Sequence, residues 1–181
     1  MNQKYTSDKS EIRRFWGDVY DVAYKKIDKD WTLENLLQAL IDLEDMFKLR
    51  RQLATEEMPL TDLKDKRVLE IGPGAGGHSA LFAKYGAIMA SLDITFERTQ
   101  ATQEKFNILG DMAEGCQALQ GDAEQLPFED AGFDVVYSNG VLHHTKDTEK
   151  SIGEVFRVLK PGGIAVVMLY CKSSWHYWFN M

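Results

Sequence analysis

The chain has 181 residues, 44% of them hydrophobic, and its 28 acidic residues outnumber 21 basic ones, which gives a formal net charge of -7. This length supports one domain with a sizeable core and a smaller additional segment. An acidic chain repels phosphate backbones, so nucleic acid is an unfavourable partner, and no apolar run reaches the roughly 20 residues of a membrane-spanning helix.

Residues 1–60 lack the strand–helix alternation of the rest of the chain, and we predict that they form an N-terminal helical cap. Apolar and aromatic residues recur every three or four positions from Ser10 to Lys26, which indicates a helix with an aromatic-rich face. Thr32 is a suitable N-cap for a second helix, which begins at Leu33. The aromatic face is compatible with packing against a sheet or with closing over a substrate.

The stretch from Arg67 to His78 reads Arg-Val-Leu-Glu-Ile-Gly-Pro-Gly-Ala-Gly-Gly-His. Its short apolar run predicts a strand, followed by a glycine-rich loop and a helix over residues 79–85. Gly72, Gly74 and Gly76 allow a tight turn and a close approach of the backbone to a ligand. The N–H groups at the helix start then face that ligand, as in nucleotide-binding α/β units.

Strands and helices alternate regularly after this loop. The pattern predicts further strands at residues 88–93, 116–120, 133–137 and 164–170, with helices at 96–109 and from Asp147 or Thr148 up to Pro161-Gly162-Gly163. Such alternation is typical of a parallel sheet covered by helices on both faces. We therefore expect residues 61–181 to form a doubly wound α/β domain that binds ligands at the carboxyl ends of its strands.

Three acidic residues stand at the predicted strand ends. Glu70 lies two residues before Gly72, and Asp93 closes the next strand, where a ribose diol would be bound. Asp122 follows the third strand, where it can accept from the exocyclic amine of adenine while the Ala123 N–H faces a ring nitrogen. Either aspartate alone is compatible with an ordinary cap or turn, but with the glycine loop they favour a nucleotide ligand.

These motifs resemble those of class I S-adenosylmethionine-dependent methyltransferases, in particular the small-molecule branch with the ubiquinone/menaquinone C-methyltransferases. The resemblance covers residues 64–172 and rests on five segments in order. They are Glu70-Ile-Gly-Pro-Gly-Ala-Gly, Leu92-Asp93, Gly121-Asp122-Ala-Glu-Gln-Leu-Pro-Phe, Phe133-Asp-Val-Val-Tyr-Ser-Asn-Gly-Val-Leu-His-His and Phe156-Arg-Val-Leu-Lys-Pro-Gly-Gly.

The resemblance implies a sheet order of 3-2-1-4-5 and a role for each motif. Glu70 and the backbone of Gly72–Gly76 would hold the methionine moiety, with Glu70 near its ammonium group. Asp93 would bind the ribose hydroxyls, and Ile94 would pack on the adenine that Asp122 and Ala123 recognise. Backbone carbonyls at Ser138–Asn139 would line the methionine side. An aromatic ring from the N-terminal helices would face the sulfonium cation, and the candidates are Tyr5, Trp16, Tyr20 and Tyr24.

His143 and His144 would border the transferred methyl group, and they are the candidate catalytic bases because imidazole titrates near neutral pH. A turn pair with one exposed ring is the simpler interpretation of the same residues. Adjacent histidines without a third ligand at a useful spacing do not predict a metal site.

The sequence therefore predicts methyl transfer from S-adenosylmethionine to a small-molecule acceptor. Two alternatives stay open: a non-catalytic cofactor-binding subunit for regulation or assembly, and a nicotinamide-dependent oxidoreductase, which Glu70 and Asp122 disfavour. Members of the family continue past the fifth strand with a helix and two further strands. We expect this chain to lack those two strands, and we expect the apolar stretch from Trp175 to Met181 to begin that helix.

The amino terminus and the cysteines predict the compartment. The first eight residues are polar and do not form a signal peptide. Cys116 and Cys171 lie far apart in apolar runs, which is typical of buried thiols in a reducing environment. We therefore expect a cytoplasmic protein.

Overall fold

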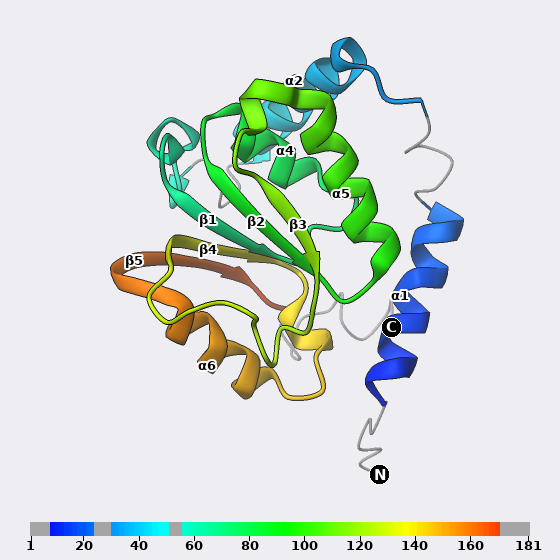
Figure 1. Ribbon diagram of the computed structural model, residues 1–181, viewed down its shortest axis with the longest axis vertical. Coiled ribbons are helices and arrows are strands. Elements are labelled where there is room, and N and C mark those ends of the chain that lie inside the picture. Colours follow the sequence, from blue (N-terminus) through cyan, green and yellow to red (C-terminus); the bar gives the residue numbers. More distant parts are fainter. Residues whose placement is uncertain (1–7, 24–29, 51–55, 171–181) are drawn as a thin grey trace.

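The computed structural model describes residues 8–23, 30–50 and 56–170. Its centre is a five-stranded parallel sheet in the order β3-β2-β1-β4-β5, as the sequence predicts (Figure 1). The strands are β1 (Arg67–Ile71), β2 (Ile88–Asp93), β3 (Gln117–Gln120), β4 (Phe133–Asn139) and β5 (Leu159–Met168). The helices are α1 (Lys9–Ala23), α2 (Leu33–Arg50), α4 (Gly77–Lys84), α5 (Phe96–Leu109) and α6 (Thr148–Val158), with 3-10 turns η1 (Leu60–Leu63), η2 (Gly110–Ala113) and η3 (Leu142–His144).

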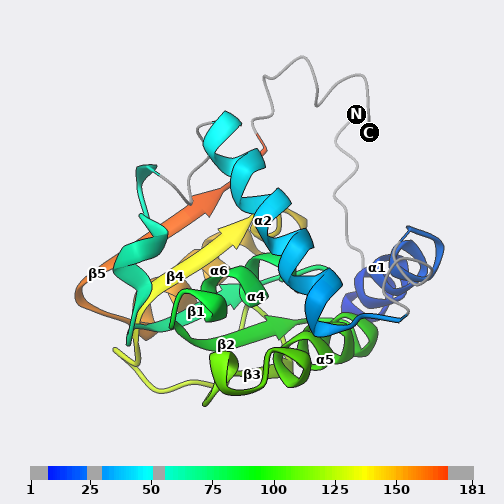
Figure 2. The ribbon, with the colours of Figure 1, turned by 90° about the horizontal axis from the view of Figure 1, so that it is seen from above.

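The helices cover the two faces of the sheet unequally. α2, α4 and α5 lie on one face and α6 lies on the other (Figures 1 and 2). Because successive side chains of a strand point to opposite faces, β1 sends Val68 into the core beneath α4 and Leu69 into the core beneath α6. The buried strands are therefore apolar on both faces, which is typical of a parallel sheet.

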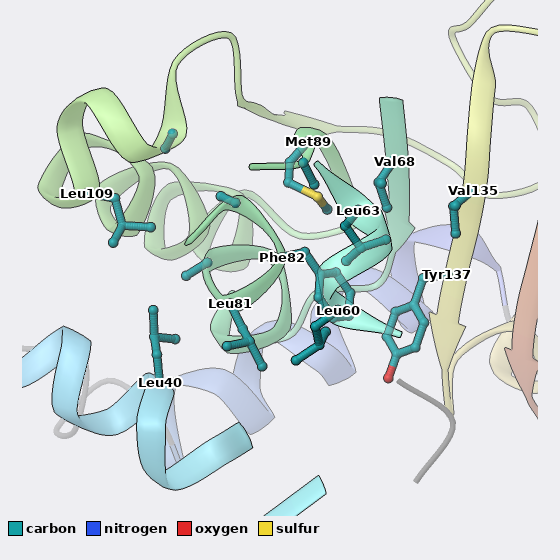
Figure 3. Packing of buried hydrophobic residues seen from close by; sticks show 14 of the residues in the cluster. Leu40, Leu60, Leu63, Val68, Leu81, Phe82, Met89, Leu109, Val135 and Tyr137 are labelled. Atoms are coloured by element: carbon teal, nitrogen blue, oxygen red, sulfur yellow. The ribbon is translucent and has the colours of Figure 1, made fainter. Parts of the chain in front are cut away.

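The larger core joins the sheet to the second helix of the N-terminal region. Leu40 of α2 packs in the same cluster as Leu81 and Phe82 of α4, while Val68 and Tyr137 reach that cluster from the sheet (Figure 3). α2 begins where the sequence predicts: the Asn35 backbone N–H donates to Thr32 Oγ1 at 3.3 Å, and the Thr32 backbone N–H donates to Asn35 Oδ1 at 2.8 Å. α2 is thus fixed both by its cap and by its buried face.

α1 is attached differently from α2. In Figure 2 it lies to one side of the molecule, next to α5. Tyr20 is its one buried side chain among those described, and Phe15 and Val22 are 59% and 82% exposed. Part of the aromatic-rich face that predicts this helix is therefore exposed to solvent.

The end of the sheet corrects one prediction. The sequence predicts that Pro161-Gly162-Gly163 separates the last helix from a strand at 164–170. Instead α6 ends at Val158 and β5 begins at once, with Leu159 opposite Phe133 and Ile164 opposite Val135. A shift of register between these pairs absorbs the proline and glycines inside the strand.

The surroundings of Cys116 differ slightly from the prediction. Cys116 lies just before β3, one residue earlier than the strand begins, and is half-buried rather than fully buried; Cys171 falls outside the described residues. The helices in the described ranges do not include one with the length and apolar character needed to cross a bilayer.

Candidate functional site

A cavity of about 470 Å³ lies at the carboxyl ends of the strands. Segments that follow all five strands contribute to its wall, and α1 adds Lys9, Ile12 and Trp16 from outside the sheet. Those three residues are spaced i, i+3 and i+7, so they share one face of α1. The volume falls in the usual range for small-molecule and cofactor sites.

The loop after β1 approaches its neighbours so closely that glycine is required at two positions. Gly72 has φ of +73°, and a Cβ atom there would lie 2.4 Å from a methyl carbon of Val141. Gly76 has φ of +83° and caps α4, and its Cβ would lie 2.7 Å from the Cα atom of Thr102. Both positions combine a left-handed backbone with a lack of space for any side chain. Gly72, Gly74 and Gly77 line the cavity.

Asp93 ends β2 with its side chain buried and its carboxylate at the cavity wall. Its Oδ1 accepts hydrogen bonds of 2.9 Å from both the backbone N–H and the hydroxyl of Thr95. Burial raises the pKa of this carboxyl, and the nearby charge of Glu70 acts in the same direction, while the Thr95 bonds and Arg98 oppose the increase. The turn after β2 thus fixes Oδ1 of this carboxylate in place.

Asp122 follows β3 and forms a second carboxylate at the cavity, together with Glu124. Its Oδ1 accepts from the Glu124 backbone N–H at 2.9 Å, and its Oδ2 accepts a short hydrogen bond from Lys9 Nζ. The same ammonium group lies 3.0 Å from Glu124 Oε2. Burial works to raise the pKa of Asp122, but the bonds from Lys9 and Glu124 outweigh it and lower that pKa.

Glu70 lies elsewhere than the sequence suggests. Its side chain is almost fully buried and does not line the cavity: Oε2 accepts a short hydrogen bond from Ser79 Oγ. Its Oε1 lies 3.6 Å from Nδ1 of His78, which does line the cavity. The His78 ring also packs against Phe47 of α2 at a centroid distance of 5.0 Å. A ligand in the cavity therefore meets His78, with Glu70 behind it.

Aromatic rings form the wall on the β4 and β5 side. The centroid of the His144 ring lies 4.9 Å from that of Trp16 and 4.0 Å from that of His143. The centroids of the His143 and Tyr170 rings are 4.2 Å apart. Trp16, His144 and Tyr170 line the cavity, and His143 lies behind them. Burial lowers the pKa of both histidines, that of His144 to about 4, so both imidazoles are neutral at pH 7. Both ring nitrogens of His143 are buried without a hydrogen-bond partner among the described residues.

The structure thus brings most of the predicted residues to one cavity. Those that line it are Gly72, Gly74, Asp93, Ile94, Asp122, Ala123, Asn139 and His144. Glu70, Gly76 and His143 lie outside the lining. Of the four predicted aromatic candidates, Trp16 lines the cavity, Tyr20 is buried elsewhere, and Tyr5 and Tyr24 fall outside the described residues.

Several lining residues were not predicted, above all Lys9, Leu43, Arg98 and Tyr170. The spacing of Lys9 from Ile12 and Trp16 was a usable signal, because it places the lysine on the aromatic-rich face of α1. Within the described ranges, no group of three histidine, cysteine or acidic side chains gathers closely enough to hold a metal ion.

Comparison with known proteins agrees with this geometry. Residues 69–167 match the family model described as a methyltransferase domain. A sterol 4-C-methyltransferase from Caenorhabditis elegans is 32% identical over 73% of this chain and 39% of its own length. An ubiquinone/menaquinone biosynthesis C-methyltransferase from Haemophilus ducreyi is 32% identical over 60% of this chain and 43% of its own length. The chain therefore spans about two fifths of the length of these relatives.

The fold also resembles that of a solved structure. The crystal structure of the YcgJ protein from Bacillus subtilis superposes with a TM-score of 0.55 and 32% identity, covering 61% of this chain and 48% of that one.

Proposed function

Because the chain belongs to the methyltransferase-domain family, we propose that its cavity binds S-adenosylmethionine and that the protein transfers the methyl group to a small-molecule acceptor. The observation that carries the proposal is the meeting of Asp93, Asp122 and the glycine loop at one cavity. Two carboxylates on neighbouring strands, beside a backbone without side chains, suit a nucleoside with a polar tail.

The residues present fit the two ends of such a cofactor. Asp93 would use its second carboxylate oxygen for the ribose hydroxyls, because Thr95 occupies the first. Asp122 would accept from the adenine amine, with Ile94 and Ala123 along the ring. The loop from Gly72 to Gly77 and the strand end at Asn139 would hold the methionine portion. Glu70 would act there through His78 rather than by direct contact.

When bound, S-adenosylmethionine supplies a methyl group whose carbon accepts an electron pair from the acceptor while the carbon–sulfur bonding pair returns to sulfur. The protein's contribution is to orient the two reactants and to exclude water. His144 and Tyr170 provide a wall without charged side chains on the β4 and β5 side, where a sulfonium cation would face aromatic rings. Trp16 lies beside them, with the Arg98 guanidinium 5.1 Å from the centre of its ring.

His144 is the better placed of the two candidate bases because it lines the cavity and His143 does not. Its neutral imidazole would accept a hydrogen bond from the acceptor hydroxyl or amine. With a pKa of about 4 it is a weak base at pH 7, so it would orient this proton and release it to water. His143 would support it from behind at a ring distance of 4.0 Å.

The net charge of the chain and the relatives named above support a small molecule as the acceptor. The net charge of -7 favours a small molecule over nucleic acid, and the relatives named above are methyltransferases of sterols and of quinone biosynthesis. A cytoplasmic location belongs to the same proposal and is supported by the free thiol of Cys116.

A transfer assay tests this function. The protein is incubated with methyl-labelled S-adenosylmethionine and a panel of quinol, phenol, sterol and amine acceptors, and label in each extracted acceptor is counted. We expect transfer to at least one acceptor, with transfer abolished in Gly72→Ala and retained in Asp111→Ala, which changes an exposed acid away from the cavity. Tight cofactor binding without transfer to any acceptor would contradict the proposed catalysis.

A further inference from the structure

Lys9 connects two segments of the protein that are far apart in the sequence. It is the first residue of α1, and its ammonium group contacts Asp122 Oδ2 and Glu124 Oε2 beyond β3. The hydrogen bonds to Asp122 and then Glu124 raise the pKa of Lys9, so the ammonium stays charged. Since Ile12 and Trp16 line the cavity from the same helix face, Lys9 fastens one end of α1 beside it.

Apart from Lys9, a backbone hydrogen bond holds each of the two carboxylates, at one of its oxygens. Asp122 Oδ1 and Glu124 Oε1 each accept a backbone N–H, from Glu124 at 2.9 Å and from Asp147 at 3.2 Å. The outer oxygens Oδ2 and Oε2 both turn to Lys9. Without the ammonium group these like charges would repel each other, although Lys150 adds a positive influence on Asp122.

We propose that Lys9 is a positioning residue that couples the docking of α1 to cofactor binding, by holding the Asp122 carboxylate at the cavity and α1 beside it. The inference rests on the proposed function, in which Asp122 accepts from the adenine amine. A carboxylate oxygen has two lone pairs, so Oδ2 can accept from Lys9 and from a ligand together. Loss of Lys9 frees Asp122 to turn away and removes a tie of the helix that carries Ile12 and Trp16.

A role confined to stability predicts a different pattern of effects. The Lys9 and Asp122 side chains are 39% and 27% exposed, and ion pairs of this exposure contribute little to global stability, but Glu124 is 6% exposed and would keep a buried, unpaired charge after the loss of Lys9. A purely structural role would therefore lower the unfolding midpoint and leave the lifetime of the complex unchanged, whereas the coupling changes both the opening of α1 and the lifetime of the complex.

The test compares four variants by the dissociation rate of S-adenosylhomocysteine and by hydrogen exchange of the amides of α1. Lys9→Met keeps the aliphatic stem and removes the charge, and we expect dissociation about fivefold faster and faster exchange across α1 even without ligand. Glu124→Gln keeps the acceptor for the Asp147 N–H and should change both readouts in the same direction. Lys9→Arg should restore most of the original rate. Lys48→Met, which breaks a comparable pair with Glu44 on α2, is the matched control and should leave both unchanged.

The outcomes separate this inference from the proposed function. If the unaltered protein does not bind S-adenosylhomocysteine, the proposed function is wrong, and exchange in the ligand-free proteins still reports whether Lys9 ties α1 down. If it binds, but Lys9→Met and Glu124→Gln dissociate within twofold of the unaltered rate, the coupling is refuted. Exchange of α1 that is equal in Lys9→Met and in the unaltered protein also refutes it.

Discussion

The carboxylates at the ends of β2 and β3 reach the same cavity in different ways. Asp93 is 5% exposed and is held by Thr95, two residues away in its own turn. Asp122 is more exposed and is held by Lys9, which is 113 residues away in the sequence. The first half of the site is therefore a property of the local chain, whereas the second depends on how an N-terminal helix docks.

The two sides of the cavity therefore differ in how easily they can change shape. The β1 and β2 side combines left-handed glycines, a buried acid and close backbone contacts, so it has little freedom to change shape. The β3 side depends on a partly exposed ion pair and on α1, whose described side chains are mostly exposed. Elements with few buried contacts are those that open first in a folded protein.

The most severe test of the rigid side is Gly72→Ala. The new Cβ would overlap Val141 at 2.4 Å on a backbone with φ of +73°, so we expect a loss of about 2–4 kcal/mol in the free energy of unfolding. Urea denaturation measures it. Gly162→Ala is the control, because φ there is +79° but no heavy atom of the described residues lies within 4 Å. It should cost about 1 kcal/mol. Equal losses in the two variants would show that the loop can relax.

Asp93→Ala tests whether the locally fixed acid binds the ligand. We expect the affinity for S-adenosylhomocysteine to fall by about 1–3 kcal/mol, because the hydrogen bonds of one carboxylate are lost. Calorimetric titration of this variant and of Asp111→Ala gives the comparison. An affinity unchanged in Asp93→Ala would remove this residue from the site.

A smaller effect is expected from His144, on the side of the cavity that α1 covers. Burial lowers its pKa from 6.5 to about 4, and the neighbouring His143 acts in the same direction. Below pH 6.5 the unfolded chain therefore binds a proton that the folded imidazole does not, and stability falls as the pH decreases from 6.5 to about 4.

His144→Phe keeps a ring against Trp16 and Tyr170 and removes this titration. Between pH 7 and pH 4.5 the variant should lose about 1 kcal/mol less stability than the unaltered protein, with solvent screening taken into account. Urea denaturation at several pH values measures the difference. Parallel losses in the two proteins would mean that His144 is accessible to water and titrates normally.

The sequence predicts the locally determined features well. β2 and α5 have the predicted bounds, Asp147 caps α6 through a 3.0 Å bond from the Lys150 backbone N–H, and the sheet order is the expected one. The bounds of β2 and α5 and the cap of α6 depend on hydrophobic period and on capping, which operate over a few neighbouring residues. The sheet order is the one that the resemblance to class I methyltransferases implies.

The features it does not predict depend on side-chain and strand contacts between separate elements. Glu70 stands beside the glycine loop in sequence, yet Ser79 and His78 take up its carboxylate and keep it outside the cavity lining. Likewise, Leu159 belongs to β5 through its pairing with Phe133 of β4. The division of the chain near residue 60 and the roles of the individual site residues stay predictions.

The central claim is that the cavity built on Gly72, Asp93 and Asp122 binds an adenosyl sulfonium compound. Calorimetric titration of the protein with S-adenosylmethionine, S-adenosylhomocysteine and NAD tests it directly. We expect both sulfur compounds to bind with one site per chain and NAD to give no heat of binding. Binding of NAD in the absence of binding by either sulfur compound would contradict the account.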